Sequence, residues 1–253
     1  MTALLLDIGN SRLKWGVLDD AAIRRTGHIA QQTVREQGIQ VITTKLPRRV
    51  DAVFASNVAG NSFATRLSGV VGVHCHCDVR FARSERRGWG VTNGYRQPRR
   101  LGVDRWVALV GAWSELERAC LVVDVGTAMT IDAIDDDGTH LGGQIIPGVE
   151  TMLESLATAT SDLPRVKAAS KQSAADLDIF GRNTTAAIRE GVQSATAGAV
   201  DRAIHALQSS GYDPEIVLTG GGASRILGAL GTTPLHRPNL VLQGLACMLE
   251  NER

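Results

Sequence analysis

Residues 4–11 read LLLDIGNS, and residues 121–128 read LVVDVGTA. In both stretches an apolar run leads into an aspartate, an aliphatic residue, a glycine and a small polar residue. The apolar run is typical of a buried strand, and the glycine lets the backbone turn tightly where that strand ends. We call these sites the first Asp-Gly turn, residues 7–11, and the second Asp-Gly turn, residues 124–128. Their separation is far too long for a solenoid repeat, so it predicts two similar halves.

Around both turns the sequence alternates between strand and helix patterns. Strands are expected at 12–17, 21–29, 50–55, 70–75, 129–134, 139–146 and 215–218, and helices at 102–115, 148–160, 184–209 and 240–250. Each half therefore opens with an antiparallel meander and continues with alternating elements. We expect an α/β protein with two halves, residues 1–117 and 118–253, each a sheet flanked by helices.

Composition excludes several classes of protein. A chain of 253 residues can bury a large core without a disulfide or metal staple, and 43% hydrophobic with 21% charged residues is ordinary for a globular protein. The net charge of +1 provides no overall attraction to nucleic acid. Four cysteines do not form a disulfide framework, and no stretch approaches the roughly 20 apolar residues of a membrane span. We expect a cytoplasmic protein with reduced thiols that binds neither membranes nor nucleic acid.

The two Asp-Gly turns carry groups that suit a phosphate site. In the first, backbone amides and the side chains of Asn10 and Ser11 can donate to phosphate oxygens, and Asp7 can hold Mg²⁺ through water. In the second, Asp124 can hold a cation and the Thr127 hydroxyl can meet a phosphate. Either turn alone could be an ordinary hairpin turn, but the pair favours a nucleotide-phosphate site.

A carboxylate and a guanidinium stand together in Gly102-Val-Asp-Arg105. Near a phosphate site, Asp104 can accept a hydroxyl proton, and Arg105 can grip a carboxylate with two hydrogen bonds. The same pair could also lie on the surface at a helix start. This pair lies at the end of the segment 80–105, which contains eight arginines and only two acidic residues. That segment could be an entrance for anionic ligands, a solvated loop or a nucleic-acid contact.

Other signals are weaker or absent. The chain contains no Walker A, G-x-S-x-G or H-E-x-x-H motif. The glycines of 142–148 and 219–222 allow close ligand approach, but each set could equally be simple turn chemistry. Residues 74–78 read HCHCD and suggest zinc. On the strand expected there, however, the cysteines and histidines would face opposite sides, so no zinc site is predicted.

Taken in order, these motifs give the chain a resemblance to the type III pantothenate kinases, a family also known as Bvg accessory factors, over essentially its whole length. The motifs that carry it are Asp7-X-Gly-Asn-Ser, Gly102-X-Asp-Arg, Asp124-X-Gly-Thr-Ala, Gly142-Gly with Pro147-Gly, and Thr219-Gly-Gly. The resemblance implies two similar actin-like halves of the acetate-and-sugar-kinase, ribonuclease-H-like type, with a central cleft. It also implies ATP-dependent phosphorylation of pantothenate to 4′-phosphopantothenate, the first step of coenzyme A biosynthesis. Mg²⁺, a monovalent cation (K⁺ or NH₄⁺) and a homodimer are implied with it.

The resemblance further implies roles for individual residues. Asp104 matches the base of a direct in-line transfer, and Asp124 matches the monovalent-cation ligand. The implied ATP-binding residues are Asp7, Ile8, Gly9, Asn10, Ser11, Arg12, Leu13, Lys14 and Thr127. The implied substrate-binding residues are Tyr95, Gly102, Val103, Asp104, Arg105 and Thr184, with Thr185 as the alternative to Thr184. Ser11 stands where the family commonly has threonine and keeps the hydroxyl.

Two other classes of function stay open at this point. The chain could be an accessory protein that uses the fold only to bind a ligand or protein. It could also be a kinase of the same superfamily that acts on a sugar or acetate. The intact Asp104-Arg105 pair and both Asp-Gly turns argue against the first. Tyr95 together with Gly102–Arg105 argues against the second.

Overall fold

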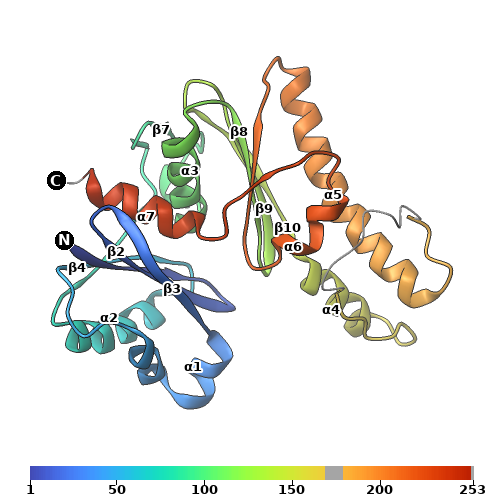
Figure 1. The fold of residues 1–253 in the computed structure, drawn as a ribbon. Helices are drawn as coiled ribbons and strands as arrows, with labels where there is room; N and C mark the ends of the chain where they lie inside the picture. Colours follow the sequence, from blue (N-terminus) through green and yellow to red (C-terminus); the bar gives the residue numbers. More distant parts are fainter. Residues whose placement is uncertain (169–178, 252–253) are drawn as a thin grey trace. The chain divides into compact units, whose positions relative to one another are not determined.

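The computed structural model describes residues 1–168 and 179–251, which form two α/β units (Figure 1). Unit 1 consists of Met1–Glu115 together with the C-terminal helix that begins at Leu240, and unit 2 of Leu116–Asn239. The expected halves, 1–117 and 118–253, place the C-terminal helix with the second half. The structure differs from that division because this helix packs with unit 1.

The strands are β1 (Thr2–Ile8), β2 (Arg12–Asp19), β3 (Ala22–Ala30), β4 (Ala52–Asn57), β5 (Val79–Phe81), β6 (Arg87–Gly88), β7 (Val91–Thr92), β8 (Cys120–Val125), β9 (Ala128–Ile134), β10 (His140–Pro147), β11 (Glu215–Thr219) and β12 (Leu235–His236). The helices are α1 (Gln31–Gln37), α2 (Asn61–Cys75), α3 (Val103–Leu116), α4 (Val149–Ala159), α5 (Thr184–Ser209), α6 (Ala223–Ile226) and α7 (Leu240–Glu250), with short 3₁₀ helices η1 (Ile39–Lys45), η2 (Pro98–Arg100) and η3 (Leu227–Ala229). The four helices expected from the sequence correspond to α3, α4, α5 and α7.

The internal duplication extends to the topology of both sheets. Unit 1 has the strand order β3-β2-β1-β4-β5, and unit 2 has β10-β9-β8-β11-β12. In each, the first three strands along the chain pair antiparallel, and the remaining two join in parallel. The predicted meander after each Asp-Gly turn is therefore confirmed.

The sheet of unit 1 is covered on both faces. One face packs against α1, α2 and η1 through a cluster that includes Leu6, Ile8 and Leu67. The opposite face lies against α7, drawn in red in Figure 1, which contacts β1, β2 and β4. Glycine lets α7 approach closely, because a Cβ on Gly244 would collide with the carbonyl of Val107 in α3. Unit 1 thus holds α3 and α7 in fixed contact.

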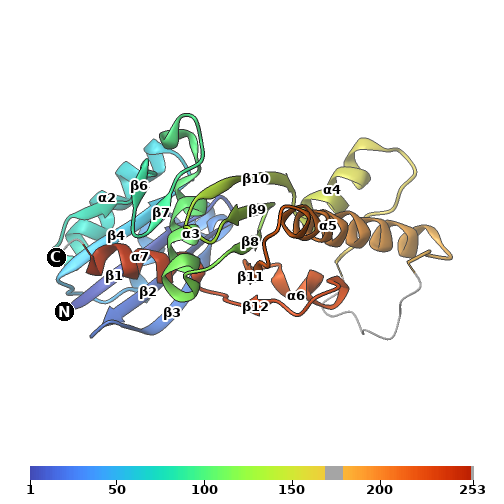
Figure 2. The same ribbon diagram turned by 90° about the horizontal axis from the view of Figure 1, so that it is seen from above.

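The sheet of unit 2 buries one face under α4 and α5 (Figure 2). Alternate residues of β8, Leu121, Val123 and Val125, point into this core, as the period of a strand requires. Asp124 consequently lies on the opposite face of the sheet.

One secondary-structure prediction was wrong. Residues 70–75, expected as a strand, are the last turns of α2. The β-branched residues suggested a strand, but Leu67, Val71 and Cys75 are the buried residues and recur every four positions, the spacing of a helix face. His76 ends this helix in a left-handed conformation with φ of 54°. The alternation used against zinc therefore does not apply. Among the described residues, no group of three or more His, Cys, Asp or Glu could hold a metal ion.

Two further observations concern the chain as a whole. None of the helices in the described residues has the length and apolar character needed to cross a membrane. All four cysteines, Cys75, Cys77, Cys120 and Cys247, are free thiols.

Candidate active site

The first Asp-Gly turn joins β1 to β2 and is held from outside by Gln31. The amide of Gly9 donates to the carbonyl of Arg12 at 3.0 Å and closes the turn. The amide of Gln31 donates to the carbonyl of Ser11 at 2.9 Å, and its Nε2 donates to the carbonyl of Gly9 at 2.9 Å. Gln31 is only 5% exposed, so water competes little for these bonds. These intramolecular hydrogen bonds fix the conformation of the turn without a ligand.

Most of the predicted ATP-binding residues lie in this turn and its two strands. Asp7 and Ile8 end β1, Gly9, Asn10 and Ser11 form the loop, and Arg12, Leu13 and Lys14 open β2. Asp7 and Lys14 are ladder partners, so their side chains share one face of the sheet. Ile8 and Leu13 are fully buried in the core, which leaves only their backbone available to a ligand.

Asp7 also has a hydroxyl neighbour on the parallel strand β4. Its ladder partner there is Ser56, and paired residues of adjacent strands point to the same face. Ser56 is 0% exposed, and its Oγ has no hydrogen-bond partner among the described residues. A buried polar group left unpaired in this way is the pattern expected where a ligand, ion or water completes the site.

The second Asp-Gly turn is held in an equivalent manner in unit 2. The amide of Gly126 donates to the carbonyl of Ala128 at 3.0 Å. The amide of Gly148 and the hydroxyl of Thr151 both donate to the carbonyl of Thr127, at 2.9 and 2.6 Å. A side chain on Gly148 would collide with the carbonyl of Gly126. Glycine at 148 therefore allows the start of α4 to pack directly against this turn.

Asp124 is confined by the glycine-rich segment that follows β11. Gly220 has φ of 92°, and a Cβ on it would overlap the Oδ1 of Asp124. The ladder partner of Asp124 on β11 is Thr219, which is 1% exposed. The predicted cation ligand and the predicted Thr-Gly-Gly motif are thus in direct contact, which the sequence did not show.

Tyr95 and Arg105, both predicted to bind substrate, lie together in unit 1. The Nη1 of Arg105 donates to the phenolic oxygen of Tyr95 at 2.9 Å, and the guanidinium lies 5.6 Å from the centre of the tyrosine ring. Arg105 is 7% exposed. The charge of the guanidinium is therefore held in place by an aromatic partner instead of moving freely in solvent.

The loop that carries Tyr95 is organised by a buried asparagine. Asn93, 1% exposed, donates through Nδ2 to the carbonyls of Glu85 and Pro98 at 3.0 and 3.2 Å. Its Oδ1 accepts from the amide of Tyr95 at 3.0 Å. Arg86 adds a hydrogen bond from Nη1 to the carbonyl of Tyr95 at 3.3 Å. The loop that presents Tyr95 is thus held by the side chains of Asn93 and Arg86.

Asp104 lies in the first turn of α3, which begins at Val103. Its Oδ1 accepts from the amide of Arg105 at 2.8 Å. A Cβ on Gly102 would come within 2.8 Å of the same oxygen. Glycine at 102 therefore leaves room beside the carboxylate that is predicted to act as base.

Thr184 stands apart from the other predicted residues of unit 2. It is the first residue of α5 and is exposed, next to the capping residue Asn183, which accepts from the amide of Ala186 at 2.9 Å. Both ribbon views show this end of α5 projecting away from β8 and β9 (Figures 1 and 2). Within unit 2, the structure does not bring Thr184 to Asp124 or Thr127.

The arginine-rich segment, residues 80–105, is partly structural. Arg86 binds the backbone of its own loop, and Arg80 lies 5.5 Å from the centre of the Phe54 ring. Together with Arg105 on Tyr95, three of the eight arginines thus contact partners within the described residues. A cavity of about 650 Å³ in this segment is lined by Arg83, Ser84, Glu85, Arg86, Gln97, Pro98 and Arg99.

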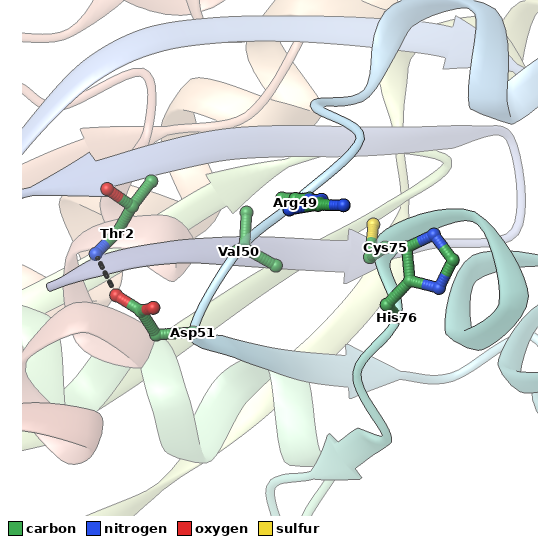
Figure 3. A pocket seen from close by; sticks show the side chains of 6 residues that line it. All are labelled: Thr2, Arg49, Val50, Asp51, Cys75 and His76. Atoms are coloured by element: carbon green, nitrogen blue, oxygen red, sulfur yellow. Dashed lines mark hydrogen bonds between the residues drawn. The ribbon is translucent and has the colours of Figure 1, made fainter.

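A second cavity, of about 450 Å³, lies at the amino ends of β1 and β4, away from Asp7. Figure 3 shows its lining residues Thr2, Arg49, Val50, Asp51, Cys75 and His76, and the 2.8 Å hydrogen bond from the amide of Thr2 to Asp51. None of the predicted site residues lines it.

Sequence reasoning missed Gln31, Asn93, Ser56 and Thr151. Each is a single polar residue that belongs to no recognisable sequence motif. Burial distinguishes Gln31, Asn93 and Ser56, which are among the buried polar residues, but it does not distinguish Thr151. Their positions become meaningful once the strand pairing is known.

Comparison with known proteins identifies the family of the chain. A profile of the type III pantothenate kinases matches residues 3–206. A type III pantothenate kinase from Azoarcus sp. (strain BH72) is 39% identical over 243 residues, covering 96% of this chain and 89% of the relative.

Solved structures show the fold. A protein from Sinorhizobium meliloti described as a 2-dehydro-3-deoxygalactonokinase aligns with a TM-score of 0.63 at 16% identity, covering 99% of both chains. A protein from Campylobacter jejuni described as a Baf family transcriptional activator aligns with a TM-score of 0.62 at 21% identity, covering 98% of both chains. The predicted fold class, two α/β halves of the sugar-kinase and actin type, is confirmed. By the profile match and the near full-length identity, the chain belongs to the type III pantothenate kinase family and is a kinase.

Proposed function

We propose that the protein transfers the γ-phosphoryl group of ATP to the primary hydroxyl of pantothenate, giving 4′-phosphopantothenate for coenzyme A biosynthesis. Family membership supports the reaction. The observation that carries the proposal in this chain is the hydrogen-bonded pair of Arg105 and Tyr95, one residue from Asp104. Pantothenate has a carboxylate at one end and a primary hydroxyl at the other. In this cluster, Arg105 is suited to the carboxylate and Asp104 to the hydroxyl.

The proposed roles of the substrate-binding residues follow from their chemistry. Arg105, oriented by Tyr95, binds the pantothenate carboxylate through paired hydrogen bonds. Asp104 accepts the proton of the attacking hydroxyl. Gly102 and Val103 supply the backbone beside this carboxylate. The hydroxyl then attacks the γ-phosphorus in line, the bond between the γ-phosphorus and the β,γ-bridging oxygen breaks, and ADP leaves, without a covalent enzyme intermediate.

We assign ATP binding to Asp7–Lys14 and to Thr127. Mg²⁺ is commonly held by one or two carboxylates together with substrate phosphates and water, and Asp7 with the unpaired Ser56 hydroxyl beside it fits that pattern. When bound, the metal neutralises charge that develops on the phosphoryl group. Lys14, on the same face as Asp7, adds positive charge for the phosphates.

Asp124 is proposed to bind a monovalent cation, K⁺ or NH₄⁺. The close approach of Gly220 fixes this carboxylate and leaves no room for a side chain there. A confined carboxylate beside backbone carbonyls such as that of Val125 supplies oxygen donors for such an ion.

A homodimer would explain the position of Thr184. This residue lies at the exposed end of α5, near Ile179 and Phe180, which are 58% and 75% exposed. These two adjacent apolar side chains offer a surface that a second copy of the chain can bury. We propose that a second copy covers them, and that Thr184 or Thr185 contacts the substrate of the partner subunit.

The test measures ADP release with a panel of substrates and MgATP, in K⁺ and in Na⁺ buffer. The panel contains pantothenate, pantothenol (which lacks the carboxylate), acetate and glucose. We expect turnover with pantothenate in K⁺ buffer, much weaker turnover with pantothenol, and none with acetate or glucose. Turnover of glucose or acetate would assign the protein to another kinase of this fold. Normal nucleotide binding without any turnover would favour an accessory role.

A further inference from the structure

Ser56 combines two properties that rarely occur together. It is 0% exposed, and its hydroxyl has no hydrogen-bond partner in the structure. A buried hydroxyl without a partner loses its hydration and gains nothing in return. Alanine has nearly the same size and would avoid that loss, so packing alone does not explain a serine here.

The position of Ser56 suggests what its hydroxyl binds. Ser56 and Asp7 are ladder partners on the parallel strands β4 and β1. Adjacent strands lie about 4.8 Å apart, and paired side chains point to the same face. Two short side chains at that spacing are within reach of one hydrogen bond after a change of rotamer. Ser56 therefore lies beside the carboxylate that is proposed to act on Mg²⁺.

The other half of the molecule repeats this arrangement. Asp124 of β8 is the ladder partner of Thr219 of β11, and Thr219 is 1% exposed. β1 and β4 in unit 1 correspond to β8 and β11 in unit 2 by sheet order. In both halves, a buried hydroxyl residue of the parallel strand thus stands next to the aspartate of the Asp-Gly turn.

We propose that Ser56 is a positioning residue for Asp7. When Mg²⁺ and nucleotide bind, its hydroxyl donates to one oxygen of the Asp7 carboxylate and directs the other oxygen toward the water shell of the metal. This inference rests on the proposed nucleotide site, but not on the identity of the phosphoryl acceptor. Ser56 itself does not touch the reacting atoms.

The test compares the wild type with Ser56→Ala in two measurements. The first is thermal unfolding without ligand. The second is calorimetric binding of a non-hydrolysable ATP analogue with Mg²⁺ and with EDTA, in the absence of pantothenate. Thr196→Val is the matched control, because Thr196 is also 0% exposed but its hydroxyl donates to the carbonyl of Val192 at 2.9 Å.

For Ser56→Ala we expect an unchanged or higher unfolding temperature and about five- to tenfold weaker binding of the Mg²⁺-analogue complex, as for the loss of one hydrogen bond. Binding in EDTA should not change. Thr196→Val should show the reverse, a lower unfolding temperature with normal Mg²⁺-dependent binding. Unchanged Mg²⁺-dependent binding by Ser56→Ala would overturn the proposal. Because pantothenate is absent, a wild type that binds Mg²⁺ and analogue but does not phosphorylate pantothenate would refute only the proposed function.

Discussion

Arg105 donates from Nη1 to the phenolic oxygen of Tyr95 at 2.9 Å, across ten residues of chain. One partner belongs to the first turn of α3, and the other to the loop after β7. Asn93 and Arg86 hold that loop through backbone hydrogen bonds. The proposed carboxylate-binding group is therefore oriented by unit 1 before substrate arrives, which lowers the entropic cost of binding.

Tyr95→Phe removes this hydrogen bond and keeps the aromatic ring. Since a hydrogen bond to a charged group is involved, we expect the KM for pantothenate to rise about tenfold with little change in kcat. Steady-state kinetics at saturating ATP measure this. The matched control is Tyr212→Phe, which changes the other tyrosine of the chain, in unit 2. An unchanged KM for Tyr95→Phe would show that the pair does not orient Arg105 for substrate.

Gln31→Met should weaken ATP binding through the first Asp-Gly turn. The change leaves the carbonyl of Gly9 without its donor from the Gln31 side chain. We expect the KM for ATP to rise about fivefold and the KM for pantothenate to stay the same. Gln32→Met is the control, since the Gln32 side chain donates to the exposed Glu36 at 2.7 Å and not to the turn. Equal effects of both changes on the KM for ATP would contradict this role of Gln31.

Gly220→Ala tests the contact between the Thr-Gly-Gly segment and Asp124. Gly211→Ala is a close control, because Gly211 has φ of 91° against 92° for Gly220, and a Cβ there would meet nothing within 4 Å. Gly211→Ala should cost about 1 kcal/mol of unfolding free energy from backbone strain alone. Gly220→Ala should cost at least twice as much and should also reduce activation by K⁺. Denaturant unfolding and K⁺ titration of activity measure the two effects, and equal destabilisation would argue against the contact.

Part of this description follows from sequence and part does not. The repeated LLLDIGNS and LVVDVGTA stretches predicted both turns and the duplicated meander, because a strand followed by an Asp-Gly turn is encoded locally. The strand expected at 70–75 was wrong because its valines have strand propensity, while the four-residue spacing that buries Val71 and Cys75 decides the structure.

Residues that act through long-range hydrogen bonds gave no sequence signal. Gln31 reaches back to Gly9, and Asn93 joins Glu85 to Pro98. The pairing of Ser56 with Asp7 depends on the parallel register of β1 and β4. Each of these relationships is created by the fold, so it could not be read from local pattern or spacing.

Burial of Cys120 predicts a loss of stability at high pH. Desolvation, with a smaller contribution from Glu215, raises its pKa from 9.0 to about 12. The folded protein therefore keeps the thiol protonated when the unfolded chain releases the proton, and the stability this provides below pH 9 is lost as pH rises toward the folded pKa. Between about pH 8 and pH 10 the wild type should lose about 1.4 kcal/mol of unfolding free energy more than Cys120→Ala. Parallel pH dependences of the two proteins in urea unfolding would contradict this.

The most direct test of the proposed reaction is phosphorus NMR of the product formed from pantothenate and MgATP in K⁺ buffer, for the wild type and Asp104→Asn. We predict a phosphomonoester on the primary hydroxyl with the wild type. Asp104→Asn should remain folded and bind the ATP analogue, but its kcat should fall at least about 100-fold, as for the loss of a general base. If Asp104→Asn formed product at the wild-type rate, the proposed mechanism would be contradicted. If the folded wild type formed no phosphopantothenate, the proposed function would be contradicted.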